Sequence, residues 1–207
     1  MTVRAASVRA GIRIEWLTIG WMILEAAVGI WAGLAARSVA LIAFGLDSVI
    51  ELVSATVVLV RLRSENRGPA MTAEQVERAE RRASRVVGWS LFVLAAYVVA
   101  HSAYDLLTRA APETSAVGIV LAVAALIVMP ALVRIKRRIS SDLGSAALRG
   151  DAAEGVVCAY MAATLLVGLA LRAAFGWWWA DPVAALGIVY FIVREGREAL
   201  AGERTCC

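Results

Sequence analysis

Residues 38–60 read SVALIAFGLDSVIELVSATVVLV, an apolar run that carries two acidic residues near its middle. A helix of about 20 apolar residues is long enough to cross the hydrocarbon core of a bilayer. Asp47 and Glu51 lie on either side of the midpoint, and their four-residue spacing places them one turn apart on a single helical face. An ionised Asp at that depth costs about 2.5–3.5 kcal/mol on insertion scales, so the two carboxyls need a cation or a shared proton. The stretch therefore predicts a transmembrane helix with a functional polar face.

The composition of the whole chain agrees with a membrane protein. Of its 207 residues, 61% are hydrophobic and 18% are charged, and the mean hydropathy is +0.74. This apolar content is too high for a water-soluble enzyme, and three cysteines, two of them at the very end, exclude a disulfide framework. We expect an all-α integral membrane protein with six transmembrane helices, over residues 15–36, 38–62, 86–107, 116–133, 144–175 and 181–201.

The basic residues predict the orientation of these helices. The chain has 21 Lys and Arg residues, and all but Arg37, Arg109 and Arg172 fall on one side of the predicted bundle. By the positive-inside rule that side is cytoplasmic, which explains the net charge of +4 without nucleic acid. Both termini are then cytoplasmic, and the two three-helix halves have inverted orientation, as in many transporters.

The same reading divides the chain into segments. Residues 1–13 are expected to form a cytoplasmic N-terminal segment, residues 14–201 a transmembrane transport domain, and residues 202–207 a cytoplasmic tail. The connection over residues 63–85 mixes acidic and basic side chains. It is read either as a solvated helical extension with weak ion pairs, such as Glu77 with Arg81, or as a surface that concentrates cations.

A second helix offers metal-binding side chains at a similar depth. Glu154 and Cys158 are four residues apart near the middle of residues 144–175. If this helix packs against residues 38–62, Asp47, Glu51, Glu154 and Cys158 converge, and three carboxylates with a thiolate suit a tetrahedral ion such as zinc. The alternatives are buried structural carboxyls and, for Cys158 taken alone, a small buried hydrophobic residue.

Other polar residues leave alternatives open. Glu25, inside the first span, either pairs with a polar neighbour or assists proton movement. Asp151 either faces Arg149 at the cytoplasmic edge or passes ions inward. Cys206 and Cys207 belong either to an unstructured tail, to a weak capture site for soft metals or to a lipidation signal.

Two short patterns concern packing and helix ends. Gly29 and Gly33 form a GxxxG pair that indicates a close contact between helices. Asp181 and Pro182 are a favourable helix start, because Asp can cap free N–H groups and Pro fits the first turn.

At these positions the sequence resembles the cation diffusion facilitator family of divalent-metal transporters. The matching stretches are 38–39 (SV), 46–51 (LDSVIE), 148–151 (LRGD) leading to Glu154 and Cys158, and 180–182 (ADP). The resemblance implies one transport site made of Asp47, Glu51, Glu154 and Cys158, a set that contains no histidine. It also implies that the protein exports ions such as zinc in exchange for protons and that it forms a homodimer. The sequence is most similar to short, membrane-only members, without the cytoplasmic C-terminal metal-binding domain.

We therefore expect a transporter rather than an enzyme, which moves a divalent transition metal out of the cytoplasm by alternating access around a midplane site. Zinc is the first choice, followed by manganese, iron, cobalt and cadmium. No cofactor is expected beyond the transported ion, and the partners are protons, lipid and a second copy of the chain in a plasma membrane. The rival functions are a proton-coupled carrier of a small organic cation, and a metal-binding membrane sensor or interaction protein that transports nothing.

Overall fold

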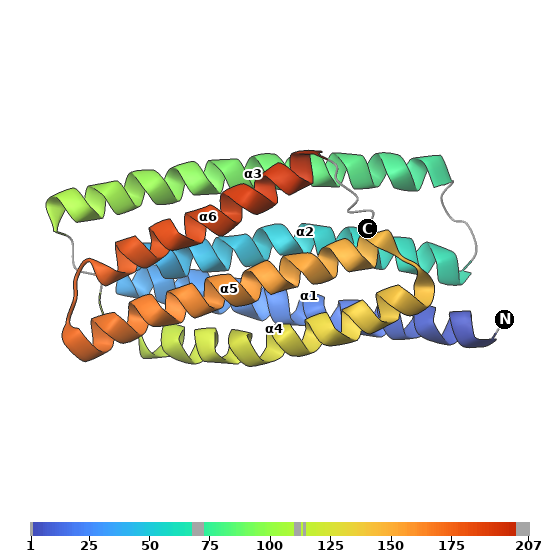
Figure 1. The fold of residues 1–207 in the computed structure, drawn as a ribbon, viewed down its shortest axis with the longest axis horizontal. Coiled ribbons are helices and arrows are strands. Elements are labelled where there is room, and N and C mark those ends of the chain that lie inside the picture. Colours follow the sequence, from blue (N-terminus) through green and yellow to red (C-terminus); the bar gives the residue numbers. More distant parts are fainter. Residues whose placement is uncertain (1, 68–72, 110–112, 114, 202–207) are drawn as a thin grey trace.

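A computed structural model describes residues 2–67, 73–109, 113 and 115–201 of the chain. Within these residues the chain is helical, without strands, and forms an elongated bundle (Figure 1). The helices are α1 (Thr2–Ala36), α2 (Val39–Arg67), α3 (Ala73–Thr108), α4 (Ala116–Leu143), α5 (Ala146–Phe175) and α6 (Ala180–Ala201). The all-α fold predicted from the sequence is confirmed.

Five of these helices, α1 to α5, are long and apolar enough to cross a membrane. The chain is therefore a multi-pass integral membrane protein. α6 is not among the five, because its C-terminal part carries several charged residues, including Arg194 and Glu198. It nevertheless packs along α3 and α5 inside the bundle (Figure 1), so a sixth crossing stays a prediction.

The observed helices run past the predicted spans, because an apolar run marks only the part of a helix that lies in lipid. α1 is helical from Thr2, so residues 2–13 of the expected cytoplasmic N-terminal segment form one continuous helix with the first span, and α4 runs to Leu143. Between residues 63 and 85, α2 continues to Arg67 and α3 begins at Ala73, which supports the helical-extension reading of this connection.

An ion pair within this extension is weak. Glu74 and Arg78 form an exposed pair at 3.1 Å, of the kind that contributes little to stability. The side chains of Glu77 and Arg81, the pair expected from the sequence, lie outside the described part of the chain.

α1 and α2 form an antiparallel hairpin. Arg37 has a left-handed backbone with φ of 54°, and the Ser38 N–H donates to the Gly33 carbonyl at 2.9 Å, which closes α1 as a Schellman motif does. The helices then run in close contact. A Cβ on Gly45 would lie 2.7 Å from the Ile30 backbone nitrogen. The close contact expected of Gly29 is confirmed, since its own Cβ would lie 3.1 Å from the Gly45 Cα.

The structure corrects the role expected of Asp181. Its carboxylate accepts from the Ser38 hydroxyl and from the Ala40 backbone N–H at 3.4 Å, so it caps the start of α2 rather than its own helix. The reason is burial: α6 packs against α2, and the free N–H groups at the start of α2 need an acceptor inside the bundle.

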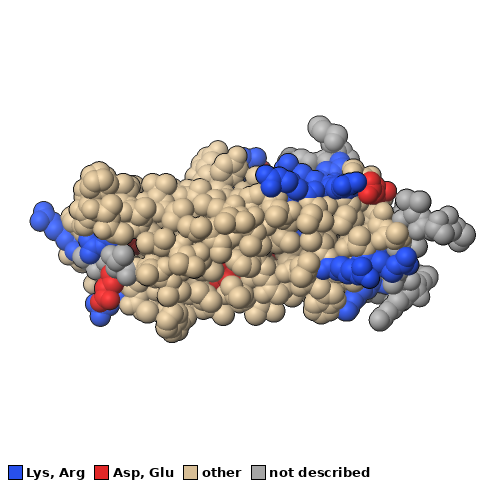
Figure 2. All heavy atoms as spheres, turned by 90° about the horizontal axis from the view of Figure 1, so that it is seen from below, with Lys and Arg blue, Asp and Glu red and all other residues tan. Residues whose placement is uncertain are grey.

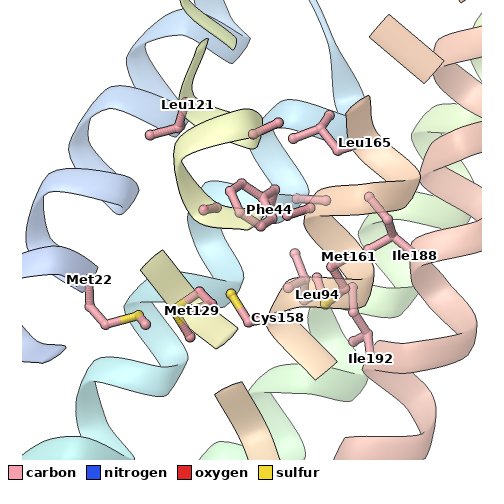
Figure 3. Packing of buried hydrophobic residues seen from close by; sticks show 14 of the residues in the cluster. Met22, Phe44, Leu94, Leu121, Met129, Cys158, Met161, Leu165, Ile188 and Ile192 are labelled. Atoms are coloured by element: carbon pink, nitrogen blue, oxygen red, sulfur yellow. The ribbon is translucent and has the colours of Figure 1, made fainter. Parts of the chain in front are cut away.

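The core is a continuous cluster of buried apolar side chains from several helices. Phe44 of α2, Met129 of α4 and Met161 of α5 belong to this cluster (Figure 3), together with Cys158, whose side chain is fully buried. The thiol expected to bind metal is therefore packed inside the bundle.

Candidate metal site

The helix that carries the predicted acidic pair lies at the centre of the fold. α2 contacts α1, α3, α5 and α6, so most of its middle turns are covered by protein, although Val49 and Val53 are exposed. The packing of α2 against α5, on which the predicted shared site depends, is present. The two helices that carry the four predicted ligands are therefore neighbours.

Asp47 is the most isolated polar group in the site. Its side chain is 1% exposed, and neither carboxylate oxygen has a hydrogen-bond partner among the described residues. Its strongest electrostatic neighbour is Glu25, another acid. A buried carboxylate without donors is costly, and a cation or a proton removes that cost. This environment is the one expected of a carboxyl that exchanges an ion.

Glu25 connects three helices at the same level. Its Oε1 atom accepts from the Ser48 hydroxyl of α2 at 2.8 Å and from the Cys158 thiol of α5 at 3.4 Å. Of the two readings left open for Glu25, a polar neighbour is thus present, and that neighbour belongs to the predicted site. Sequence spacing could not reveal this contact, because Glu25 lies on a different helix from its partners.

Glu154 faces α2 from α5. Ser54 of α2 lies within hydrogen-bonding range of its carboxyl, and Asp47 and Asp151 act on it electrostatically. Glu51, which is 7% exposed, acts electrostatically on Cys158. The four predicted ligands thus line one interface between α2 and α5, with Glu25 joining from α1.

These side chains do not form a preassembled cage. Within the residues that the structure describes, no three His, Cys, Asp or Glu side chains lie close enough together to hold a metal ion. Zinc needs its oxygen ligands at about 2.0–2.2 Å, so these groups would have to move toward one another to bind it. The assignment of Asp47, Glu51, Glu154 and Cys158 as ligands therefore stays a prediction.

A small pocket lies beside this interface. It is lined by apolar side chains from α1 and α4, by Gly155 of α5, and by four charged side chains, namely Glu51, Lys136, Asp151 and Glu154. Glu51 and Glu154 thus share a pocket with Asp151. This neighbourhood agrees with the reading in which Asp151 passes ions inward.

Asp151 also has a partner that sequence reasoning missed. Lys136 of α4, only 3% exposed, forms ion pairs with Asp151 and, at 3.3 Å, with Glu15 of α1. The alternative partner, Arg149, is exposed. The sequence does mark Lys136, because it is the only lysine in the chain. It lies in the basic run RIKRR, however, and that run was used only to predict the orientation in the membrane.

The terminal cysteines, Cys206 and Cys207, lie outside the described residues, so their capture of a soft metal stays a prediction.

Comparisons with known proteins agree with this architecture. The family described as the cation efflux transmembrane domain matches residues 16–201. An uncharacterized transporter of Synechocystis sp. is 30% identical over 187 residues, which cover 89% of this chain. The match spans 60% of the length of that relative.

Proposed function

The chain belongs to the cation efflux family, and on that premise we propose that it exports a divalent transition-metal ion, zinc before others, in exchange for protons. Because the chain belongs to this family, it is a cation transporter. The choice of metal, the exchange for protons and the ligand set of Asp47, Glu51, Glu154 and Cys158 are our proposals.

The observation that carries the proposal is the environment of Asp47. Both of its oxygens are buried in the middle of α2 without a hydrogen-bond donor among the described residues, and the charged groups around them are acidic. Such a site favours a small, strongly charged cation over a neutral solute. Three carboxylates and one thiol favour zinc and similar ions over magnesium, which prefers oxygen ligands and retains water.

Exchange for protons follows from the chemistry of the ligands. Carboxylates and thiols bind a metal only when deprotonated, so metal and protons compete for the same atoms. When the site opens to the cytoplasm, the metal displaces protons from these groups. When it opens to the other side, protons displace the metal. Glu25 holds the Cys158 thiol through a hydrogen bond, and it therefore takes part in this exchange.

The pocket beside the site argues against the rival function of an organic-cation carrier. An organic ammonium is commonly bound against aromatic rings. The described residues that line the pocket include methionine, leucine and valine, but no Phe, Tyr or Trp. A metal sensor that transports nothing has the same ligands, and only a flux measurement separates it from a transporter.

The decisive experiment is metal flux into sealed vesicles that contain the purified protein and a zinc-sensitive dye. We expect Asp47→Asn to abolish zinc flux, because the substitution removes a charge from the site while preserving the size of the side chain. The matched control is Asp142→Asn, at an exposed position near the end of α4, and it should transport as the unmodified protein does.

Normal zinc flux from well-inserted Asp47→Asn would refute the site. Absence of flux from the unmodified protein, with zinc still bound at equilibrium, would favour the sensor.

A further inference from the structure

A buried lysine lies where α1, α4 and α5 meet. The ammonium of Lys136 is enclosed by the carboxylates of Glu15 and Asp151, and all three side chains are at most 7% exposed. A charge inside a membrane protein is costly and usually marks function. The cluster holds two acids for one base, so with all three groups ionised it carries one negative charge.

Lys136 differs from the other basic residues of its helix. Arg134 and Arg138 are exposed, whereas Lys136 points into the bundle. Figure 2 shows the same contrast on a larger scale, since the blue Lys and Arg atoms of the visible face gather toward the ends of the molecule. A buried cation in this position is therefore a special feature of α4 rather than part of the basic surface that orients the protein.

The cluster is connected to the candidate site. Lys136 and Asp151 line the same pocket as Glu154 and Glu51, and Lys136 acts electrostatically on Glu154. Asp151 lies one turn before Glu154 on α5, toward the α4–α5 connection. That connection is on the side that we predict to be cytoplasmic, from which an exported ion arrives.

We propose that Lys136 is a positioning residue that weakens the hold of this pocket on the transported cation. The ammonium neutralises Asp151 and opposes a divalent cation in the pocket beside Glu154, so the ion binds loosely enough to move on. Glu15, which does not line the pocket, tunes this effect by sharing the ammonium with Asp151. This inference rests on the proposed function, because it concerns the same transport path.

Charge variants of the two residues outside the predicted ligand set provide the test. Lys136→Met removes the positive charge and should lower the apparent KM for zinc flux about three- to tenfold, because the pocket becomes more negative. Glu15→Gln leaves the ammonium to Asp151 alone and should raise KM by a similar factor. The double variant restores the original net charge and should return KM to within about twofold of the starting value.

Two controls separate charge from packing. Lys136→Arg keeps the charge and should change KM by less than about twofold, and Arg138→Gln, on the exposed face of the same helix, should leave it unchanged. A lysine that only fastens three helices together predicts instead that Lys136→Met and Glu15→Gln shift KM in the same direction. That result, or an unchanged KM in both, overturns the proposal.

If Lys136→Met does not insert into the membrane, Glu15→Gln alone still tests the proposal, since an unchanged or lowered KM for this variant contradicts the proposed role.

Equilibrium dialysis of each detergent-solubilised variant against Zn²⁺ provides a second measurement that does not need transport. If the unmodified protein shows no flux, the proposed function fails. Opposite shifts in Zn²⁺ affinity for the two variants would even then support the role of Lys136, and equal shifts would refute it.

Discussion

At the scale of single residues, Cys158 is the proposed ligand on which the preference for a soft ion depends. Its thiol is fully buried, donates to Glu25 at 3.4 Å and lies beside Met129 in Figure 3. A thiolate is a better ligand for cadmium and zinc than for manganese, which prefers oxygen. The residue is therefore either a selective ligand or a packing element, and the two roles have different consequences.

We expect Cys158→Ser to lower cadmium and zinc flux about tenfold while manganese flux falls much less, because the oxygen that replaces sulfur is a harder ligand. Cys158→Asp, which restores a charged oxygen ligand, should raise manganese flux relative to cadmium flux. The measurement is the flux ratio of the three metals in vesicles. If all three ions are affected equally by both variants, Cys158 is a packing residue and the site has at most three ligands.

How far sequence alone could predict the site depends on where the relevant partner lies. Asp47 with Glu51, and Glu154 with Cys158, are recognisable because each pair lies on one helix and repeats at four residues. The contact of Glu25 with Cys158 was not predictable, since it joins α1 to α5 and depends on how the helices rotate.

Lys136 is the opposite case. The sequence shows that Lys136 is the single lysine of the chain. Its burial between α1 and α5 depends on how the helices pack, and only the structure shows it.

At the scale of helices, the contact between α1 and α2 fixes the position of the site. Gly33 of α1 lies against Ile42 of α2 at a distance that leaves no room for a Cβ, and Gly29 lies tightly against Gly45. Close backbone approach of this kind replaces the hydrophobic driving force that is absent between helices in lipid. The contact lies a few residues from Asp47, so it also sets how near Glu25 comes to α2.

The same contact makes a stability prediction. Gly45→Ala places a Cβ at 2.7 Å from the Ile30 backbone nitrogen, and the helices must separate to admit it. We expect the folded state to be destabilised by about 1–3 kcal/mol, the usual cost of overpacking. The measurement is size-exclusion chromatography after heating, in which the temperature that halves the monodisperse peak should fall.

The matched control is Gly20→Ala on α1, where no neighbouring atom lies within 4 Å of the added methyl. It should leave that temperature unchanged or raise it slightly, because alanine favours the helix by about 0.5–1 kcal/mol. Equal thermal stability of the two variants would mean that the α1–α2 contact is looser than the structure shows.

The ends of helices were harder to predict than their middles. Ser115 and Ser145 cap α4 and α5 through their own side chains, in the way that the residue types suggest. Asp181 instead caps α2, which is distant in sequence. In a tightly packed bundle the acceptor nearest to a buried helix end can come from another helix, and sequence patterns describe only local caps.

At the scale of the whole molecule, the connections sort into two ends. The N-terminal part of α1, the C-terminal end of α2, the start of α3 and the α4–α5 turn lie at one end of the bundle (Figure 1). The α1–α2 turn and the α5–α6 turn lie at the other end (Figure 1). Between the ends, the face visible in Figure 2 is mostly free of basic side chains, as expected for a surface in contact with lipid. Successive connections thus alternate between the two ends of the bundle. The cytoplasmic position of the basic end and the crossing of α6 stay predictions.

Labelling of single cysteines with a membrane-impermeant maleimide on sealed cells tests both points. The variants are made in a protein whose own three cysteines are replaced, with one new cysteine at an exposed position: Asp142, Glu113, Trp177 or Arg197. Because the basic residues gather at the Asp142 end, we expect label at Glu113→Cys and Trp177→Cys from outside. Asp142→Cys and Arg197→Cys should be labelled only after the cells are opened. Labelling of Asp142→Cys from outside would show that the orientation is the reverse of the predicted one, and the proposed export would then be uptake. Equal labelling of Trp177→Cys and Arg197→Cys from one side would mean that α6 lies along the bundle without crossing the membrane.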